Sequence, residues 1–174
     1  MTDRTRVEQV DELLDRNAIV AVTRRMAECL DQLDWTGLEA CFLEELTVRY
    51  GYVLGDRLTA MPAAAFVDAW HEATAGLEAT QHLLANHRVD VRGDEATCTA
   101  YCLVQHYYPE PSGGCTWTLG GHYDFGFVRT DDGWRIGRLE LADVWATGNR
   151  HLLERAAREA GGRAGRDPRR RQSD

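Results

Sequence analysis

Hydrophobic positions in the first part of the chain follow the period of an α-helix. Between residues 7 and 33, apolar side chains recur at three- and four-residue spacing, as on one face of a helix. The positions are Val10, Leu13, Leu14, Ile19, Val22, Met26 and Leu30. This pattern predicts a long amphipathic helix, broken near Asn17, with its apolar stripe directed toward a core.

Three further elements are predicted before residue 80. Thr36 is a suitable N-cap and predicts a short helix in the sequence GLEACFLEE, residues 37–45. The next segment, LTVRYGYVL, is rich in β-branched and aromatic residues and predicts a strand that ends in a turn at Gly55 and Asp56. A proline near the start of residues 61–77 and a glycine near their end predict a second long helix.

The second half of the chain has the composition of β-strands. Four segments predict strands, at residues 80–91, 95–109, 115–130 and 133–148. Turns are predicted at Gly93–Asp94, Gly113–Gly114 and Asp132–Gly133, and a last short helix at residues 151–160. The Gly- and Arg-rich residues 161–174 predict a disordered tail.

Helices followed by consecutive hairpins are typical of an α+β domain. We expect a cone-shaped, curved antiparallel sheet wrapped around the N-terminal helices, with a pocket on its concave face. With 174 residues, 44% of them hydrophobic, the chain suffices for a single domain, which we expect to span residues 1–160.

Composition and charge narrow the range of functions. The chain has no apolar run of 18 residues and its first residues are polar, which predicts neither a membrane span nor a signal peptide but a cytoplasmic protein. A net charge of −8 argues against a nucleic-acid surface on the folded part. The five cysteines lack close CxxC pairing, so we interpret them as reduced and mostly core-filling.

Asp31, His82 and His106 are the candidate catalytic residues, because they come from three segments that such a fold would bring around one pocket. Burying Asp31 is costly without a partner, and a neighbouring histidine would satisfy its charge. Alternatively, Asp31 is exposed at the helix end or caps a loop amide, although Asp34 is better placed as a cap. His106 is either a core imidazole or a catalytic one.

Strand alternation selects the other residues of the predicted pocket. His82 and His87 point to opposite faces of their strand, which places His87 outside. Of His122 and Tyr123, only one can enter the pocket, and Tyr123 aligns with further aromatic residues. The predicted lining residues are Leu84, Asn86, Cys102, Val104, Trp117, Tyr123 and Phe125. Asp31 and the two histidines lack HxH or HExxH spacing, so we expect no metal site and no cofactor.

Three stretches of the sequence resemble one known family. The opening DRNAIVAVTRRMAECLDQLDWTGLEACF, the strand TQHLLANHRVDV and the hairpin GGHYDFGFVRTDDGWRIGRLEL are similar to the SnoaL-like branch of the nuclear-transport-factor-2-like superfamily. The resemblance covers roughly residues 8–155 and implies a cone-shaped α+β barrel with an interior pocket. It also implies a dimer formed through the outer face of the sheet.

Within that superfamily, the candidate residues resemble those of scytalone dehydratase and the bile-acid dehydratases. The resemblance assigns Asp31 as the aspartate at the end of the first helix, and His82 and His106 as two catalytic histidines. It also assigns Tyr50 as a tyrosine that orients a water or a carbonyl. The sequence departs from the pattern at Leu30 and Met26, where those enzymes carry a tyrosine.

These observations predict a cofactor-independent acid/base enzyme, a dehydratase or a related isomerase or cyclase. Its substrate would be a hydrophobic cyclic or polyketide-like small molecule. His82, polarised by Asp31, would take a proton beside a carbonyl, and His106 or a tyrosine-held water would protonate the leaving hydroxyl or stabilise the enolate. The alternative is a non-catalytic ligand-binding or structural subunit, such as the small subunit of a ring-hydroxylating dioxygenase. We expect a homodimer with no nucleic-acid or membrane partner.

Overall fold

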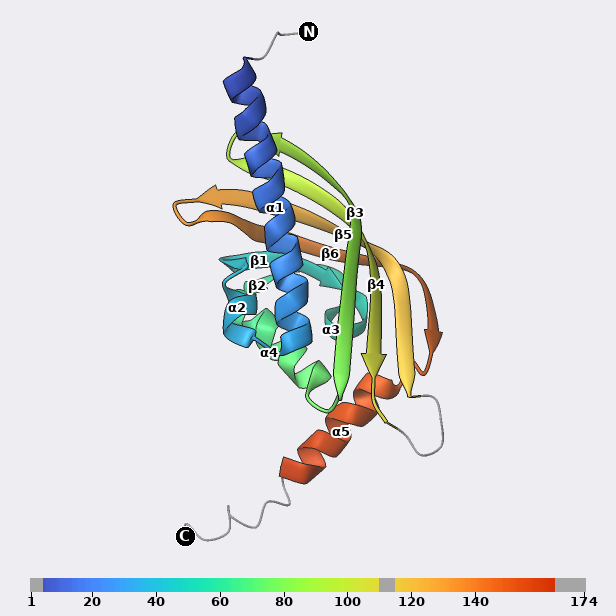
Figure 1. Ribbon diagram of the computed structural model, residues 1–174. Helices are drawn as coiled ribbons and strands as arrows, with labels where there is room; N and C mark the ends of the chain where they lie inside the picture. Colours follow the sequence, from blue (N-terminus) through green and yellow to red (C-terminus); the bar gives the residue numbers. More distant parts are fainter. Residues whose placement is uncertain (1–4, 110–114, 165–174) are drawn as a thin grey trace, which may run out of the picture.

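The computed structural model describes residues 5–109 and 115–164 and shows an α+β fold. A long N-terminal helix lies across one face of a curved sheet, and shorter helices cover one end of that face (Figure 1). The helices are α1 (Arg6–Gln32), α2 (Trp35–Glu39), α3 (Gly51–Leu54), α4 (Ala63–Thr74) and α5 (Leu152–Ala164). The strands are β1 (Phe42–Tyr50), β2 (Gly55–Pro62), β3 (Ala79–Arg92), β4 (Glu95–Tyr107), β5 (Thr116–Thr130) and β6 (Gly133–Gly148).

The sheet is open and mixed, with strand order β2-β1-β6-β5-β4-β3. Strands β3 to β6 form the expected antiparallel hairpins, whereas β1 pairs with β6 in parallel. The expected α+β class and curved sheet are confirmed, but the antiparallel prediction is wrong for this one pair. A parallel neighbour could not be predicted from hairpin signals, because β1 and β6 are far apart in the sequence.

Helix α1 is continuous through Asn17, so the predicted break is absent. Asn17 is exposed on the outer side of the helix, where a polar side chain costs little. Thr5 and Glu8 form a capping box at the start of α1, and Leu33 ends the helix in the left-handed region with φ 58°. One uninterrupted helix therefore begins at an exposed N-terminal end and places Asp31 in its last turn, beside the core.

An ionic cluster fixes the first half of α1 to the tips of the hairpins. Arg129 donates to both carboxylate oxygens of Asp15 over 2.8 and 2.7 Å, and Trp134 donates its Nε1–H to Asp15 over 3.1 Å. The Arg129 guanidinium also lies 4.3 Å from the Trp134 ring centre. These contacts hold the helix at a defined angle across the sheet.

The segment between α1 and α4 differs most from the prediction. Asp34, not Thr36, caps α2 by accepting from the Gly37 amide over 2.9 Å, and the helix ends at Glu39. Residues from Phe42 onward form β1, because Phe42, Leu46 and Val48 are buried at strand spacing. The expected turn at Gly55 is instead the start of β2, an edge strand whose side chains are mostly exposed.

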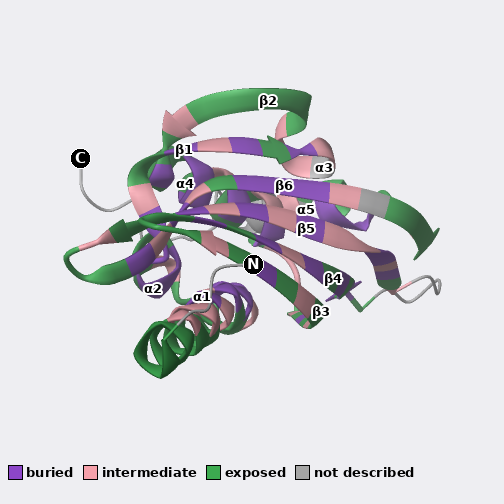
Figure 2. Cartoon of the chain, turned by 90° about the horizontal axis from the view of Figure 1, so that it is seen from above, coloured by how far each residue is buried: buried purple, intermediate pink, exposed green. Residues whose placement is uncertain are grey.

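The core fills the space between the sheet, α1 and α4. Its largest fully buried side chains include Trp70, Tyr50, Tyr123 and Phe66. Buried residues alternate with exposed ones along β4 and mostly with half-buried ones along β5, so each strand presents one face to the core (Figure 2). In the described ranges, no helix is both long enough and apolar enough to cross a membrane.

The last helix, α5, extends past the predicted end of the domain at residue 160. Leu152, Leu153 and Ala156 are buried, and the backbone of Ala156 packs so closely against Gly76 that a Cβ there would lie 2.0 Å from the Ala156 carbonyl oxygen. The helix thereby closes the end of the fold near α4. The predicted tail at 161–174 overlaps α5 in its first residues, and residues 165–174 lie outside the described ranges.

Candidate active site

Asp31 and His82 form a hydrogen-bonded pair between the last turn of α1 and the middle of β3. Asp31 Oδ1 lies 2.7 Å from His82 Nδ1, and Asp31 Oδ2 accepts from the His82 backbone N–H over 2.9 Å. The alternative of Asp31 as a local helix or loop cap does not describe this arrangement. Because a carboxylate accepts hydrogen bonds, His82 carries a proton on Nδ1, which leaves the lone pair of the neutral ring on Nε2.

The second ring nitrogen of His82 lies in a dry environment. The His82 side chain is 0% exposed, whereas that of Asp31 is 24% exposed. Within the described ranges His82 Nε2 is buried and has no hydrogen-bond partner. Trp70 packs edge-on to the imidazole with ring centres 6.1 Å apart. A buried basic nitrogen backed by a carboxylate is the arrangement of a general base.

His106 lies beside His82 on the neighbouring strand. The two ring centres are 6.3 Å apart at an interplanar angle of 79°, and Trp117 stacks on the other side of His106 at 5.4 Å. Burial, and secondarily the positive charge that His82 carries when it is protonated, lowers the pKa of His106 to about 3. His106 is therefore neutral at physiological pH. A neutral imidazole can donate or accept a hydrogen bond but does not supply the acidic proton of an imidazolium.

Thr80 is a site residue that the sequence analysis did not single out. Its hydroxyl lies 2.9 Å from His106 Nδ1, and Thr80 is the register partner of His106 across β3 and β4. The available signal was its position on β3, two residues before His82 and therefore on the same face.

Tyr50 and Tyr123 meet in the interior. Their hydroxyl groups are hydrogen-bonded to each other, and both residues are almost fully buried. The Tyr50 ring also packs against Trp70, with centres 5.1 Å apart, and Trp70 in turn contacts His82. The predicted choice of Tyr123 over His122 for the inward face agrees with this burial, since His122 is on the outer face beside Asp124.

Most of the remaining residues that were predicted to line the pocket are buried in the core. The buried ones are Cys102, Val104, Trp117 and Phe125, and Leu84 is partly buried against the core. Their apolar and aromatic character makes the surroundings of the two histidines water-poor.

Asn86 is an exception, because a β-bulge changes the alternation that placed it beside His82. The register with β4 shifts between Ala85 and Arg88, and Asn86 takes the left-handed conformation with φ 54°. Asn86 is exposed, and the residues after it change faces. His87, expected on the outer face, consequently lies near α1 with Nε2 3.0 Å from the Thr23 hydroxyl. The face predictions for Asn86 and His87 were wrong.

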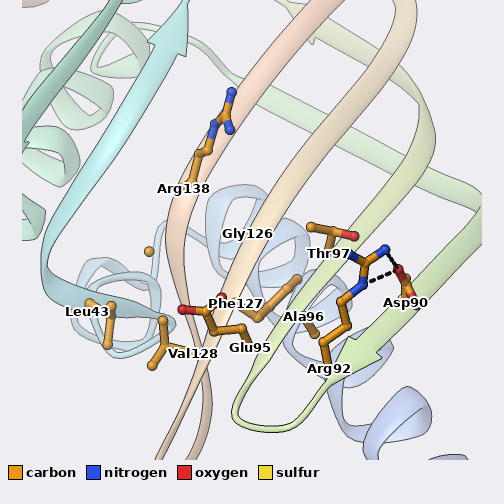
Figure 3. Close-up of a pocket in the computed structure, with 11 residues that line it drawn as sticks. Leu43, Asp90, Arg92, Glu95, Ala96, Thr97, Gly126, Phe127, Val128 and Arg138 are labelled. Carbon is orange, nitrogen blue, oxygen red and sulfur yellow. Dashed lines mark hydrogen bonds and ion pairs between the residues drawn. The ribbon is translucent and has the colours of Figure 1, made fainter.

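Free space lies on both faces of the sheet. A gap on the helix side is too small to hold a water molecule, and it is lined by Met26, Leu30, Leu38, Phe42, Tyr50, Phe66, Trp70 and Leu139. A larger cavity of about 550 Å³ lies on the opposite face of the sheet, where Asp90 and Arg92 form an ion pair and Arg138 is nearby (Figure 3). That cavity has none of the three candidate catalytic residues in its lining. In residues 5–109 and 115–164, no three His, Cys, Asp or Glu side chains are grouped as metal ligands.

Comparison with known proteins identifies relatives of this fold. The model of the SnoaL-like domain matches residues 11–140. The Kfla4162 protein from Kribbella flavida has a similar structure, with a TM-score of 0.77 and 28% identity over 82% of this chain and 99% of that protein. A protein assigned as a scytalone dehydratase from Novosphingobium aromaticivorans gives a TM-score of 0.69 and 23% identity, over 79% of this chain and 89% of its own.

A hexachlorocyclohexane dehydrochlorinase of type 2 is also similar in structure. It gives a TM-score of 0.67 and 18% identity over 81% of this chain and 93% of that enzyme. The chain matches none of the curated proteins. At these identities, the two named enzymes support the fold and not a particular reaction.

Proposed function

Because the chain belongs to the SnoaL-like family, we propose that it is a cofactor-independent acid/base enzyme that removes a proton next to a carbonyl group. The observation that carries this proposal is the Asp31–His82 pair, whose free ring nitrogen lies in a buried, aromatic environment. The family includes cofactor-independent dehydratases and isomerases, and dehydration, isomerisation and cyclisation all begin with such a proton transfer.

In the proposed reaction, His82 Nε2 takes the proton and the C–H electron pair forms an enolate. Asp31 stabilises the resulting imidazolium, because its carboxylate accepts the Nδ1–H and remains ionised. In a dehydration, the enolate then expels a hydroxyl group from the neighbouring carbon, and the imidazolium returns its proton to give water. In an isomerisation, the same proton goes to a different carbon. His106 stays neutral and acts as a hydrogen-bonding group toward the oxygen that becomes negative.

The substrate class follows from the residues around the pair. Trp70 packs against His82 and Trp117 against His106, and both buried rings offer flat, apolar surfaces. Such a lining favours a hydrophobic cyclic or polyketide-like molecule that carries few polar groups. The Tyr50–Tyr123 pair supplies hydroxyl groups in an interior that lacks the tyrosine expected next to Asp31.

Deuterium exchange tests the proton transfer without knowledge of the natural substrate. The protein is incubated in D₂O with 1-tetralone or 2-tetralone, and deuterium at the α-carbon is measured by mass spectrometry. We expect exchange above the buffer rate and its loss in His82→Gln, while His71→Gln, which changes an exposed histidine, retains it. Equal rates for the wild-type protein and His82→Gln would contradict the proposal.

A non-catalytic subunit is the second candidate, and it is favoured by Leu30 and Met26, which stand where the dehydratases that the sequence resembles carry a tyrosine. Binding of 2-tetralone, measured by calorimetry, with no deuterium exchange would support a ligand-binding subunit over an enzyme.

We further propose a homodimer formed through the outer face of the sheet. Leu83, Tyr101, Leu103 and Tyr107 lie on this face with 54%, 59%, 39% and 37% of their surface exposed. Leu83 and Leu103 are register partners on β3 and β4, so the exposed apolar side chains form one patch. Patches of this kind on a soluble domain mark interaction sites.

A further inference from the structure

Thr80 and Asp31 occupy equivalent places beside the two histidines. Each presents an oxygen to the Nδ1 atom of one imidazole, at 2.9 Å for Thr80 and His106 and 2.7 Å for Asp31 and His82. The oxygens differ in one chemical respect. A carboxylate can only accept a hydrogen bond, whereas a threonine hydroxyl can also donate one.

A second threonine–histidine pair, Thr23 and His87, shows how the hydroxyl proton determines which residue donates the hydrogen bond. Thr23 donates its only hydroxyl proton to the Val20 carbonyl over 2.8 Å. It can therefore only accept from His87, so His87 carries its proton on Nε2, the nitrogen that faces Thr23 at 3.0 Å.

The hydroxyl proton of Thr80 has a different destination. Across the described ranges, the contact with His106 Nδ1 is the one hydrogen bond of the Thr80 hydroxyl. If Nδ1 carried the imidazole proton, the Thr80 proton would face no protein acceptor. If Nδ1 accepts from Thr80, the hydroxyl is satisfied and the proton of the neutral ring lies on Nε2. Thr80 as the donor therefore uses its hydroxyl proton within the protein, whereas the reverse direction leaves that proton to solvent at the half-buried Thr80.

We propose that Thr80 is a positioning residue that holds neutral His106 in the Nε2–H tautomer, so that His106 donates a hydrogen bond to the substrate carbonyl oxygen. The catalytic role of this donor rests on the proposed function, whereas the tautomer of His106 follows from the contact with Thr80 alone. The two histidines then differ in the role of Nε2, because their Nδ1 partners differ. Asp31 makes Nε2 of His82 a base, and Thr80 makes Nε2 of His106 a hydrogen-bond donor. Formation of an enolate needs both a base and a donor, because the substrate loses a proton from its α-carbon while negative charge develops on its carbonyl oxygen.

The tautomer matters because His106 is neutral, and a neutral imidazole donates a hydrogen bond from only one of its two nitrogens. An imidazolium would donate from both nitrogens whatever its neighbour. Full burial and the neighbouring His82 lower the pKa of His106 to about 3, so only the two neutral tautomers compete at physiological pH. An uncharged hydroxyl partner, unlike a carboxylate, does not favour the charged ring.

Nitrogen NMR of the full chain labelled with ¹⁵N-histidine tests the tautomer directly. Long-range ¹H–¹⁵N correlations distinguish a protonated Nε2 from a protonated Nδ1 in each ring. We expect His106 to be protonated on Nε2 in the wild-type protein and in Thr80→Ser, and to shift toward Nδ1–H in Thr80→Val. The matched control is Thr23→Val, which removes the other threonine partner of a histidine and should leave the His106 signals unchanged.

A wild-type spectrum with His106 protonated on Nδ1 would overturn the inference even if Thr80→Val failed to fold. An unchanged His106 tautomer in a folded Thr80→Val protein would also overturn it. The activity readout is the deuterium exchange of 2-tetralone, in which Thr80→Val should lower kcat by roughly 10–100-fold with little change in KM, and Thr80→Ser should restore it. Absence of exchange in the wild-type protein would refute the proposed function and leave the tautomer result standing.

Discussion

The hydroxyl groups of Tyr50 and Tyr123 are hydrogen-bonded to each other although their strands are not neighbours. Both residues are register partners of Leu141 on β6, the strand between β1 and β5. The two rings therefore extend from either side of Leu141 and meet with centres 6.0 Å apart. This contact connects β1, which pairs with β6 in parallel, to the antiparallel strand β5, next to the candidate active site.

Removing either hydroxyl of this pair should destabilise the fold, because each single substitution breaks the shared hydrogen bond. We expect Tyr50→Phe or Tyr123→Phe to lower the free energy of unfolding by about 0.5–1.5 kcal/mol, because the hydrogen bond between the two buried hydroxyls is lost. The double variant should be less destabilised than the sum of the single variants. Urea denaturation of the four proteins measures this, and strictly additive losses would show that the two hydroxyls do not depend on each other.

The buried, neutral His106 should make stability depend on pH. Its folded pKa, about 3, lies below the ordinary value of 6.5, so the unfolded chain binds a proton that the folded protein excludes. Stability is fully present above about pH 6.5 and falls as the pH drops toward 3, by at most about 1.4 kcal/mol per pH unit.

His106→Asn tests this dependence, because it removes the titrating group. Between pH 7 and pH 5, the free energy of unfolding should fall less steeply in the variant than in the wild-type protein. Parallel curves would contradict a neutral His106.

The Asp15–Arg129 contact should contribute measurably to stability. The hydrogen bond from Arg129 lowers the pKa of Asp15 below its ordinary value of 3.8, so the stabilisation is present above that pH and is lost as the pH falls through the folded pKa. Asp15→Asn should lower the free energy of unfolding at pH 7 by about 1–2 kcal/mol. Asp90→Asn, which breaks the exposed pair with Arg92, should change it by less than about 0.5 kcal/mol. Similar losses in both variants would show that Asp15 does not anchor α1.

Charge on the outer face of the sheet should abolish the proposed dimer. Tyr101→Glu and Leu103→Glu place a carboxylate in the exposed apolar patch and should give a monomer by light scattering after gel filtration. Leu58→Glu on the edge strand β2 is the control, because Leu58 is equally exposed but lies away from that patch. A wild-type monomer, or a dimer that survives both substitutions, would contradict this interface.

The features that could be predicted from the sequence are those set by local periodicity. The α1 stripe, the β3–β6 hairpins and the inward faces of β4 and β5 follow directly from spacing and turn residues. Asp31 and His82 could be predicted as candidates because they lie on separate segments that the expected fold brings together, and because the resemblance to the dehydratases assigns both. Their pairing in the structure depends on α1 lying across β3, which local patterns do not encode.

The features that were missed depend on contacts between distant residues or on single backbone torsions. The parallel β1–β6 pair joins segments far apart in the chain, and no turn signal marks it. At Asn86 one residue in the left-handed conformation reverses the alternation of β3 and brings His87 to α1. Thr80 acquires its importance only from standing opposite His106, and strand register fixes that relation.

The rate of α-proton exchange in Asp31→Asn tests the central claim most directly. Asparagine keeps the size of the side chain but removes the charge that stabilises protonated His82, so exchange of 2-tetralone should fall by about 10²–10⁴-fold while the fold is retained. Asp34→Asn, a neighbouring change at the cap of α2, should keep the wild-type rate. Unchanged exchange in Asp31→Asn would contradict the assignment of Asp31 and His82 as the catalytic pair.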